Sequence, residues 1–331
     1  MRLPPQSAAR AVAVCLLTLI FAAFLNAKGM RKTAEIQQPG LQRSVGLAVA
    51  RPLVGVSSFL YLTEPRRGIQ VALGRQSWDA IDTQVRFTLP PARPHPVKPV
   101  APVRVPPRHR RAALPRFTAA HPLRVWVAGD SLAEVPGQGL QRVAGSSVDI
   151  VGVESRLSTG LARPDLYNWF LRIPAAVRQL APKVVVLSFG ADDAHNYLAG
   201  VPKGRTVGPL GSPSWNAEYR RRVEGVTREL AARGIYVVWL GLPIPAGSGF
   251  QHSFPIVNRI IESVAKQNAR SSVYVDTWHM LDDAHGRYTP YLRVHGKLTL
   301  MRLPDGVHYT AAAGDLIAQQ VLGRLRTRFS F

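Results

Sequence analysis

Three residues of the sequence could form a nucleophile with its base and orienting acid. Ser131 follows a Gly-Asp pair at the end of the apolar run 125–128, and Asp305 precedes His308 by three residues. A serine hydroxyl is a weak nucleophile until a neighbouring base takes its proton, and histidine is the commonest such base. Asp305 could orient the imidazole and stabilise the imidazolium. These residue types predict acyl transfer by a Ser-His-Asp triad.

Acyl transfer also requires hydrogen-bond donors for the oxygen that becomes negatively charged. The backbone N–H groups of Ser131 and Gly160 are the candidates in this sequence. A glycine at position 160 allows a ligand to approach the backbone closely. Each residue also has a plain structural interpretation, since Ser131 could cap a helix and Gly160 could serve a turn. The combination with the Asp-x-x-His motif favours the chemical interpretation.

Apolar runs alternate with helical stretches from residue 123 onward, and these elements must position the candidate residues. Strands separated by helices predict right-handed βαβ units and one parallel sheet covered on both faces. The expected strands are 125–128, 148–153, 183–189, 235–240 and 273–276. The expected helices are 135–144, 165–180, 215–233, 255–269 and 311–328.

The carboxyl ends of parallel strands form the usual ligand-binding edge of such a sheet. Ser131 follows the first expected strand, Gly160 the second, and the pair Asp192 and Asp193 the third. His308 lies beyond the fifth strand, just before the last helix. The sequence therefore predicts that these residues, distant along the chain, gather at one edge. Asp193 is expected to hydrogen-bond loop backbone groups rather than to react.

The same residues carry a resemblance to a known family. The chain from 123 to 328 resembles an SGNH (GDSL-type) hydrolase domain, with residues 129–132 as the GDSL block, Gly160 as the second block and 305–308 as the DxxH block. Residues 158–169 are further similar to membrane-anchored extracytoplasmic bacterial members of uncharacterised function. The resemblance implies a flavodoxin-like three-layer α/β/α fold with a five-stranded parallel sheet. It also implies ester hydrolysis.

One position departs from the family pattern. The third family block is Gly-x-Asn-Asp, whose asparagine donates to the oxyanion, but this chain has Asp192 at the asparagine position. An ionised carboxylate offers no donor and repels a developing negative charge. Asp192 could stay protonated beside Asp193, since a like charge raises a carboxyl pKa. Otherwise the two backbone donors act at a reduced rate, or the domain binds without catalysing.

The N-terminal part of the chain predicts a membrane anchor. Residues 1–10 are basic, and residues 11–27 contain 15 apolar residues of 17 with no charge. This length is at the lower edge of a bilayer span, and a cleaved signal peptide is the alternative. Within the juxtamembrane region 28–89, residues 44–62 form a second apolar run that Arg51 and Pro52 interrupt. We expect it to lie on the membrane or on the folded domain as an amphipathic helix.

The net charge of +22 is concentrated outside the predicted folded domain. Residues 1–122 carry 18 Lys and Arg against 4 Asp and Glu, and the stretch 90–122 is rich in Pro and Arg. We expect 90–122 to be an extended linker that could also adhere to an anionic surface. It is not expected to bind nucleic acid, because 90–116 contains no aromatic residue for base stacking.

No cofactor or metal is predicted. The single cysteine, Cys15, excludes an intrachain disulfide, and the Asp-Asp-Ala-His tetrads at 192–195 and 282–285 lack the further ligands of a two-metal site. The sequence thus predicts a single-pass protein of a bacterial inner or plasma membrane with residues 123–331 on the extracytoplasmic side. The expected activity is removal of O-acyl groups, acetyl above all, from an acylated cell-envelope glycan or a small ester. O-acyl transfer on the same polymers and non-catalytic envelope binding are the alternatives.

Overall fold

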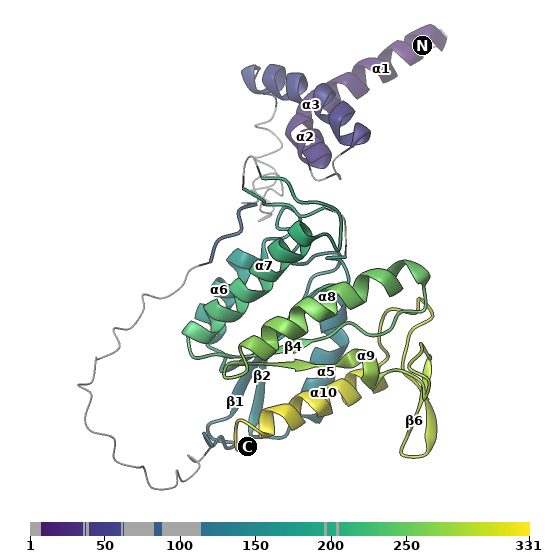
Figure 1. The fold of residues 1–331 in the computed structure, drawn as a ribbon. Helices are drawn as coiled ribbons and strands as arrows, with labels where there is room; N and C mark the ends of the chain where they lie inside the picture. Colours follow the sequence, from purple (N-terminus) through teal and green to yellow (C-terminus); the bar gives the residue numbers. More distant parts are fainter. Residues whose placement is uncertain are drawn as a thin grey trace, which may run out of the picture. The chain divides into compact units, whose positions relative to one another are not determined.

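The computed structural model describes residues 8–35, 37, 40–60, 62, 83–87, 114–194, 197–202 and 205–331. The chain divides into two compact units, Met1–Thr83 and Gln84–Phe331 (Figure 1). The predicted basic n-region 1–10 and the predicted linker 90–122 lie largely outside the described residues, and His195 does so entirely.

The N-terminal unit consists of three helices, α1 (Ala8–Leu25), α2 (Ala27–Glu35) and α3 (Leu41–Phe59). Helix α1 has a mean hydropathy of 2.3 and is long and apolar enough to cross a membrane, a property that a signal sequence shares. Helix α3 packs on α2, and the hydroxyl of Ser57 donates a hydrogen bond of 2.7 Å to the carbonyl of Phe24. The predicted anchor at 11–27 therefore corresponds closely to α1.

Helix α3 contains most of the predicted amphipathic segment 44–62. Pro52 lies inside the helix, and Ala50 and Ser57 are buried on the side that faces the other two helices. Large apolar side chains remain exposed elsewhere on the helix, namely Leu41, Val45, Val49, Val56 and Phe59. The helix thus has apolar residues on more than one face.

The C-terminal unit is built on a parallel sheet of five strands in the order β2-β1-β3-β4-β5. The strands are β1 (Leu123–Gly129), β2 (Val148–Ser155), β3 (Val184–Ser188), β4 (Tyr236–Leu240) and β5 (Ser272–Val275). Strand β3 is buried throughout, which explains its continuous apolar sequence. The register aligns Gly129 with Ser155 and Ser188, so that three strands end side by side.

Helices cover both faces of the sheet. Helices α5 (Glu134–Val143) and α10 (Ala311–Arg326) pack against each other on one face. Helices α6 (Trp169–Leu180), α7 (Pro213–Ala232) and α8 (Ser248–Gln267) lie on the other face (Figure 1). The chain passes from β1 to β2 in one direction across the sheet and from β2 through β3, β4 and β5 in the other. Right-handed crossovers therefore place α5 on one face of the sheet and α6, α7 and α8 on the other. The predicted three-layer α/β/α fold is confirmed.

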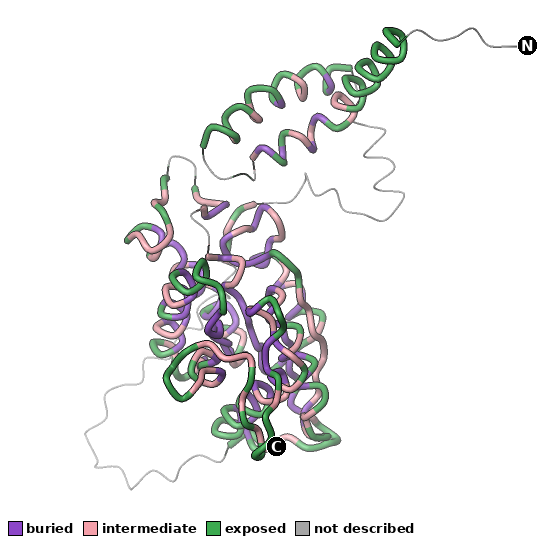
Figure 2. Tube along the Cα trace, turned by 90° about the vertical axis from the view of Figure 1, so that its right-hand side faces the viewer, coloured by how far each residue is buried: buried purple, intermediate pink, exposed green. Residues whose placement is uncertain are grey.

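The core lies between the sheet and its helices. Figure 2 shows the buried residues running along the strands and the inward sides of the helices. Large side chains complete this core: Trp126, Trp169, Trp215, Trp239, Phe189 and Phe254 are all fully buried. The apolar surroundings of Trp126, Trp169, Trp239 and Trp278 in the sequence favour a core role over a sugar site. The first three are fully buried, whereas Trp278 is only partly buried and packs against the edge of the core.

Some boundaries differ from those expected. Helix α6 begins at Trp169 rather than at 165, because the side chain of Asn168 caps it by accepting from the Phe170 N–H at 3.0 Å. Helix α8 begins at Ser248 rather than at 255, and the rings of Phe250 and Phe254 pack together at 5.0 Å in its first two turns. This pair is four residues apart on one helix, so its contact stabilises the first turns locally.

An antiparallel hairpin was not predicted. It consists of β6 (Tyr291–Val294) and β7 (Lys297–Leu300), and His295 and Gly296 form its turn, both with positive φ. A two-residue turn with two positive φ angles is typical of a tight hairpin. The short helix α9 (Thr277–Met280) precedes it. Both elements lie between β5 and the Asp-x-x-His motif at 305–308.

The compact unit begins earlier in the chain than residue 123. Phe87 packs edge-on against Phe170 with ring centroids 5.5 Å apart, and Phe117 packs likewise against Phe329 at 5.7 Å. The N–H of Phe117 also donates to the Ser330 carbonyl at 2.7 Å. Phe87, which precedes the predicted linker 90–122, and Phe117, which lies within it, therefore belong to the packed domain.

Candidate active site

Ser131, His308 and Asp305 form one continuous chain of hydrogen bonds. Ser131 opens the short 3-10 helix η2 (Ser131–Ala133) directly after β1. Its Oγ lies 2.8 Å from Nε2 of His308, and Nδ1 of the same imidazole lies 2.8 Å from Oδ2 of Asp305. Ser131 and His308 are 177 positions apart in the chain. This is the geometry in which a base can take a serine proton while an acid holds its tautomer.

The Asp-x-x-His motif is a tight turn that Asp305 organises. Oδ1 of Asp305 accepts from the backbone N–H groups of Val307 at 2.8 Å and His308 at 2.9 Å, which leaves Oδ2 for the imidazole. Burial raises the pKa of Asp305, but these hydrogen bonds outweigh it and hold the pKa below its usual range. Asp305 is therefore ionised at neutral pH, as a partner of an imidazolium must be.

The buried side chain of Arg302 fixes this turn by hydrogen bonds to its carbonyl groups. The side chain is 1% exposed, and its guanidinium donates to the carbonyls of Ile244 at 3.0 Å, Gly306 at 3.0 Å and Val307 at 2.8 Å. Gly306 has a φ of +71°, and a Cβ there would lie 2.3 Å from the Cβ of Ala246. The turn that presents His308 thus depends on one buried arginine and on a glycine that no larger residue can replace without a shift.

Asp130, the neighbour of the serine, is a fully buried structural acid. One carboxyl oxygen accepts from the Leu132 N–H at 2.9 Å, and the other accepts from the N–H groups of Gly190 at 3.0 Å and Ala191 at 3.2 Å. Burial, and then the charge of Asp192, raise the pKa of Asp130 well above its usual value. The side chain ties the turn after β1 to the loop after β3.

The Gly160 loop is fixed by a buried carboxylate. Asp193 accepts from the N–H groups of Leu161 at 3.0 Å and Ala162 at 2.7 Å, and from the Tyr219 hydroxyl at 2.6 Å. A Cβ at Gly160 would lie 2.0 Å from Oδ1 of Asp193, so only glycine fits there. The predicted structural role of Asp193 is therefore correct.

A buried guanidinium holds the carbonyls of the same loop. Arg222 of α7 is fully buried and donates to Leu161 at 2.8 Å, Ala162 at 3.2 Å and Ala199 at 2.6 Å. Glu218 balances its charge at 2.9 Å. Within the described residues no hydrogen bond engages the N–H of Gly160. The loop is thus rigid while its candidate donor stays available.

Asp192 is the acid at the position where the family has an amide. Burial, and then the neighbouring charge of Asp193, raise the pKa of Asp192 to about 6, although the Ser158 N–H and the charge of His308 oppose the shift. The carboxyl is consequently neutral below pH 6 and ionised above it. The expectation of a protonated Asp192 therefore holds on the acidic side of neutrality.

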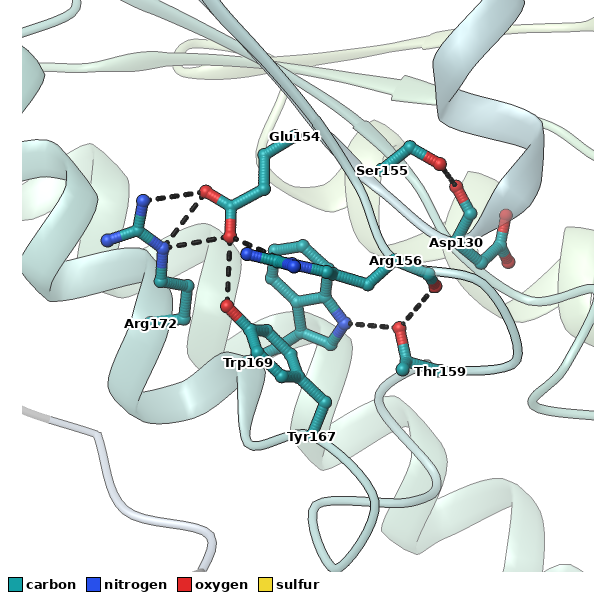
Figure 3. A network of polar contacts seen from close by, with 8 residues as sticks. All are labelled: Asp130, Glu154, Ser155, Arg156, Thr159, Tyr167, Trp169 and Arg172. Atoms are coloured by element: carbon teal, nitrogen blue, oxygen red, sulfur yellow. Dashed lines mark hydrogen bonds and ion pairs between the residues drawn. The ribbon is translucent and has the colours of Figure 1, made fainter. Parts of the chain in front are cut away.

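A polar network outside the triad supports the loop that follows β2 (Figure 3). Glu154 binds the Arg172 guanidinium at 2.7 Å and accepts from the Tyr167 hydroxyl at 2.9 Å. Burial raises the pKa of Glu154, but the hydrogen bonds from Arg172 and Tyr167 bring it below its usual value. Thr159, adjacent to Gly160, accepts from the Trp169 indole at 3.0 Å.

The structure brings the predicted triad residues together and places Gly160 in a loop beside them. Sequence patterns did not indicate the roles of Asp130, Arg222 and Arg302. Each of them joins segments that are distant in the chain, as the bonds to Gly190, Leu161 and Ile244 show. Arg302 lies in an apolar stretch that hints at a buried position, whereas Arg222 lies among other charged residues. No group of three or more His, Cys, Asp or Glu side chains suited to a metal ion occurs among the described residues.

Comparison with known proteins bears on the family. Among solved structures, the chain is similar to a GDSL-like lipase from Bacteroides thetaiotaomicron, with 15% identity over 62% of this chain and 88% of that one and a TM-score of 0.42. It is also similar to the psychrotrophic esterase EstA from Pseudoalteromonas sp., with 14% identity, coverage of 62% and 97%, and a TM-score of 0.40. A third similar structure is LAE5, an α/β hydrolase from the metagenome of Lake Arreo. Its identity to this chain is 14% over 63% of this chain and 97% of that one, and the TM-score is 0.43.

None of the curated proteins compared matches this chain. The strand order and the Gly-Asp-Ser-Leu motif at the carboxyl edge agree with the predicted resemblance to SGNH-type hydrolases. A family model described as a protein of unknown function, DUF459, matches residues 124–324, which is more than half of the chain and nearly all of the sheet and helices of the C-terminal unit. Because that match covers both the strand edge and the Asp-x-x-His turn, the chain belongs to the DUF459 family.

Proposed function

We propose that the protein is a serine esterase that removes O-acyl groups, with acetyl as the expected group, from a cell-envelope polysaccharide. The observation that carries the proposal is the hydrogen-bonded chain from Asp305 through His308 to Ser131, with 2.8 Å at both links. An imidazole that already accepts from a serine hydroxyl is poised to take its proton. The ionised Asp305 would stabilise the imidazolium that forms.

In the first half-reaction, Ser131 Oγ attacks the acyl carbon while Nε2 of His308 takes the hydroxyl proton. The carbonyl π electrons move to oxygen and form the tetrahedral oxyanion. When the oxyanion collapses, the bond to the sugar oxygen breaks and the imidazolium returns its proton to that oxygen. The products are a free sugar hydroxyl and an acyl-Ser131 ester.

The second half-reaction regenerates the serine. Water loses a proton to His308 and attacks the acyl-enzyme, and the released Ser131 recovers the proton, so that a carboxylic acid leaves. A sugar hydroxyl in place of water would make the protein an O-acyltransferase. Acceptor competition distinguishes the two, because a transferase yields more acylated oligosaccharide than free acid when the oligosaccharide is added.

The oxyanion would be held by the N–H groups of Ser131 and Gly160. The first N–H groups of a helix have no partner within the helix, and Ser131 opens η2. The clamp of Asp193 and Arg222 fixes the Gly160 loop in advance, so little reorganisation is needed during reaction. Asp192 would add a third donor only while its carboxyl is protonated.

The proposed location follows from the N-terminal unit and the charge. Helix α1 would anchor the chain in a bacterial inner or plasma membrane as a single span, with the C-terminal unit on the extracytoplasmic side. The excess of positive charge suits an anionic envelope surface, with residues 90–122 as a possible point of adhesion. Cell fractionation tests this directly, and a soluble mature form that begins near residue 28 would contradict the anchor.

Acetate release tests the proposed activity. The full-length protein in a nonionic detergent should release acetate from O-acetylated envelope polysaccharide, and Ser131→Ala should lower that rate by a factor of about 1,000 or more. A Ser155→Ala variant is the matched control, because Ser155 also ends a strand at this edge but its hydroxyl bonds only the Asp130 carbonyl at 3.0 Å. Equal rates for wild type and Ser131→Ala would refute the proposal.

Asp192 favours one second candidate, a non-catalytic envelope-binding protein. An ionised carboxylate near the oxyanion would disfavour the charge that acyl transfer develops. Loss of one oxyanion donor typically costs a factor of about 100 to 1,000 in turnover. This candidate predicts glycan binding without release of acid at any pH, whereas the esterase predicts measurable release below pH 6, where Asp192 is neutral.

A further inference from the structure

A second Asp-x-x-His turn lies at the carboxyl end of β5. Oδ1 of Asp276 accepts from the N–H groups of Trp278 at 3.0 Å and His279 at 3.2 Å, and Oδ2 lies 2.6 Å from Nδ1 of His279. The arrangement repeats that of Asp305 and His308. It differs in having no serine, since Nε2 of His279 has no hydrogen-bond partner among the described residues. The imidazole is thus oriented and open for a ligand.

The turn forms one wall of a pocket of about 230 Å³. The opposite wall is α8, and the lining includes Arg259, Glu262, Tyr274, Asp276, Trp278 and His279. The volume is below the roughly 300–1,000 Å³ of pockets for drug-sized ligands, so it suits one small ring. Trp278 is only partly buried, and its indole offers an apolar face within a polar lining.

Both acids of the lining, Glu262 and Asp276, have a basic partner, and Lys266 of the first pair lies outside the lining. Glu262 pairs with Lys266 at 2.7 Å, and Asp276 pairs with His279. The hydrogen bond from Asp276 raises the pKa of His279, which favours a cationic imidazole. Arg259 is exposed and, within the part of the chain that the structure describes, has no hydrogen bond or ion pair. Its planar fork of donors matches a carboxylate or a phosphate.

The pocket lies on the same edge of the sheet as Ser131. Strand β5 is three positions from β1, which corresponds to roughly 14 Å at the usual strand spacing. Thr277 of the turn donates to the Gly241 carbonyl at the end of β4, and it also contacts Tyr309, the residue after His308. The two Asp-x-x-His turns are therefore packed together at one edge, where an extended polymer could reach both.

We infer that this pocket is a subsite for an anionic unit of a saccharide polymer, with Arg259 binding the anionic group and Trp278 packing against the sugar ring. The inference rests on the proposed function, since it names the polymer whose acyl group Ser131 would attack. The anionic group could be a sugar carboxylate or a phosphodiester, and the guanidinium recognises both. The basic charge of the whole chain favours the same class of polymer.

Binding to a non-hydrolysing protein tests the subsite separately from the activity. Full-length Ser131→Ala protein in nonionic detergent carries 15N-labelled tryptophan, and Trp278→Phe assigns the Trp278 indole signal. Trigalacturonate supplies a carboxylate probe, a glycerol phosphate oligomer supplies a phosphodiester probe, and chitotriose is neutral. We expect one anionic probe to shift the Trp278 signal saturably at low salt, with chitotriose giving no shift. The probe that binds identifies the source of the anion.

Arginine variants decide between the pocket and general charge. Arg259→Ala should weaken the binding at least about tenfold, equal to about 1.4 kcal/mol. Arg178→Ala removes an exposed arginine of α6 that likewise has no partner among the described residues, and it should leave the affinity unchanged. The inference is overturned if no anionic probe shifts the Trp278 signal, or if both variants weaken binding equally. An inactive protein that still binds through Arg259 would refute the esterase but not the subsite.

Discussion

Asp192 is the residue that we expect to set how the rate of the proposed reaction depends on pH. The triad geometry is complete without it, but its carboxyl changes from a hydrogen-bond donor to a negative charge as the pH rises through about 6. Loss of this donor should slow the wild-type reaction as the pH rises above about 6.

Replacement of Asp192 by asparagine isolates this effect. Asp192→Asn supplies an amide donor at every pH, whereas wild-type protein loses its donor above pH 6. The ratio of the variant kcat to the wild-type kcat on an aryl acetate should be near one at pH 5. It should rise by up to about 100-fold at pH 8.

The matched control for Asp192→Asn is Asp282→Asn. Asp282 is the first residue of the second Asp-Asp-Ala-His tetrad and lies in a polar turn. The ratio of the Asp282→Asn kcat to the wild-type kcat should not change with pH. A flat ratio for Asp192→Asn as well would mean that Asp192 does not face the oxyanion. A lower rate at every pH would mean that the carboxyl has a role that an amide cannot fill.

At the scale of single residues, the sequence indicated the reacting groups better than the groups that hold them. Ser131, His308 and Asp305 carry recognisable local motifs, and the structure brings them within hydrogen-bond distance. Arg222 and Arg302 carry no such motif, because Arg222 binds carbonyl groups that are remote in sequence and Arg302 joins the nearby turn to the remote Ile244 carbonyl. Such positions become visible only when the fold fixes which segments are neighbours.

The loop that carries Gly160 shows how elements position the site. It has no regular structure of its own, yet Asp193 from the loop after β3 binds its N–H groups and Arg222 from α7 binds its carbonyls. Both side chains are buried and charged, and a buried charge is costly unless it is hydrogen-bonded. Each side chain therefore depends on the loop groups that it binds. The loop is therefore as well defined as a helix end.

Arg222→Met tests this clamp. Removal of the guanidinium leaves three buried carbonyls without this donor and leaves Glu218 with Arg221 as its remaining partner, and loss of one member of a buried ionic network typically costs about 3–5 kcal/mol of unfolding free energy. We also expect kcat on an aryl acetate to fall by at least about tenfold, because the Gly160 N–H loses its fixed position. Urea titration and steady-state kinetics measure the two effects.

Arg228→Met is the control on the same helix. Arg228 pairs with Glu224 at 2.6 Å but is 63% exposed, and a surface pair of this kind contributes at most about 1 kcal/mol. Little change in stability and none in kcat is expected. If both arginine variants behaved alike, the Gly160 loop would not depend on the buried guanidinium.

The regular elements of the sheet domain could be predicted from sequence because local and tertiary preferences agree there. Strands such as β3 and β4 are continuous apolar runs, and helices separate them at regular spacing. The hairpin of β6 and β7 was missed because its strands have only four residues each, which is too short for a clear periodic pattern. The His295-Gly296 pair was the available signal, since it suits a tight turn.

At the scale of the whole molecule, the packed domain includes residues before and within the predicted linker 90–122. Composition suggested that the domain begins at 123, since a stretch so rich in proline and arginine cannot build a core. Two phenylalanines nevertheless join the core from outside that boundary, Phe87 against α6 and Phe117 against the C-terminal residues. Single aromatic anchors of this kind leave little trace in average composition.

Truncation of these anchors should weaken the C-terminal unit. Phe87→Ala and Phe117→Ala in the full chain should each lower the unfolding free energy by about 2 kcal/mol, since each removes a largely apolar ring from a packed site. Phe250→Ala is the comparison, because Phe250 is 41% exposed, and its cost should be clearly smaller. Thermal unfolding of the three variants measures this, and three equal midpoints would place the domain start at 123 after all.

The most direct test of the account is covalent labelling of the serine by a fluorophosphonate. The reagent reacts with a serine hydroxyl only where a base activates it, and so it reports the nucleophile without any assumption about the substrate. The account predicts modification of the folded wild-type protein at Ser131, located by peptide mass analysis. Labelling should be lost in His308→Ala and retained in His279→Ala. Folded wild-type protein that stays unlabelled, or labelling that survives in His308→Ala, would contradict the triad.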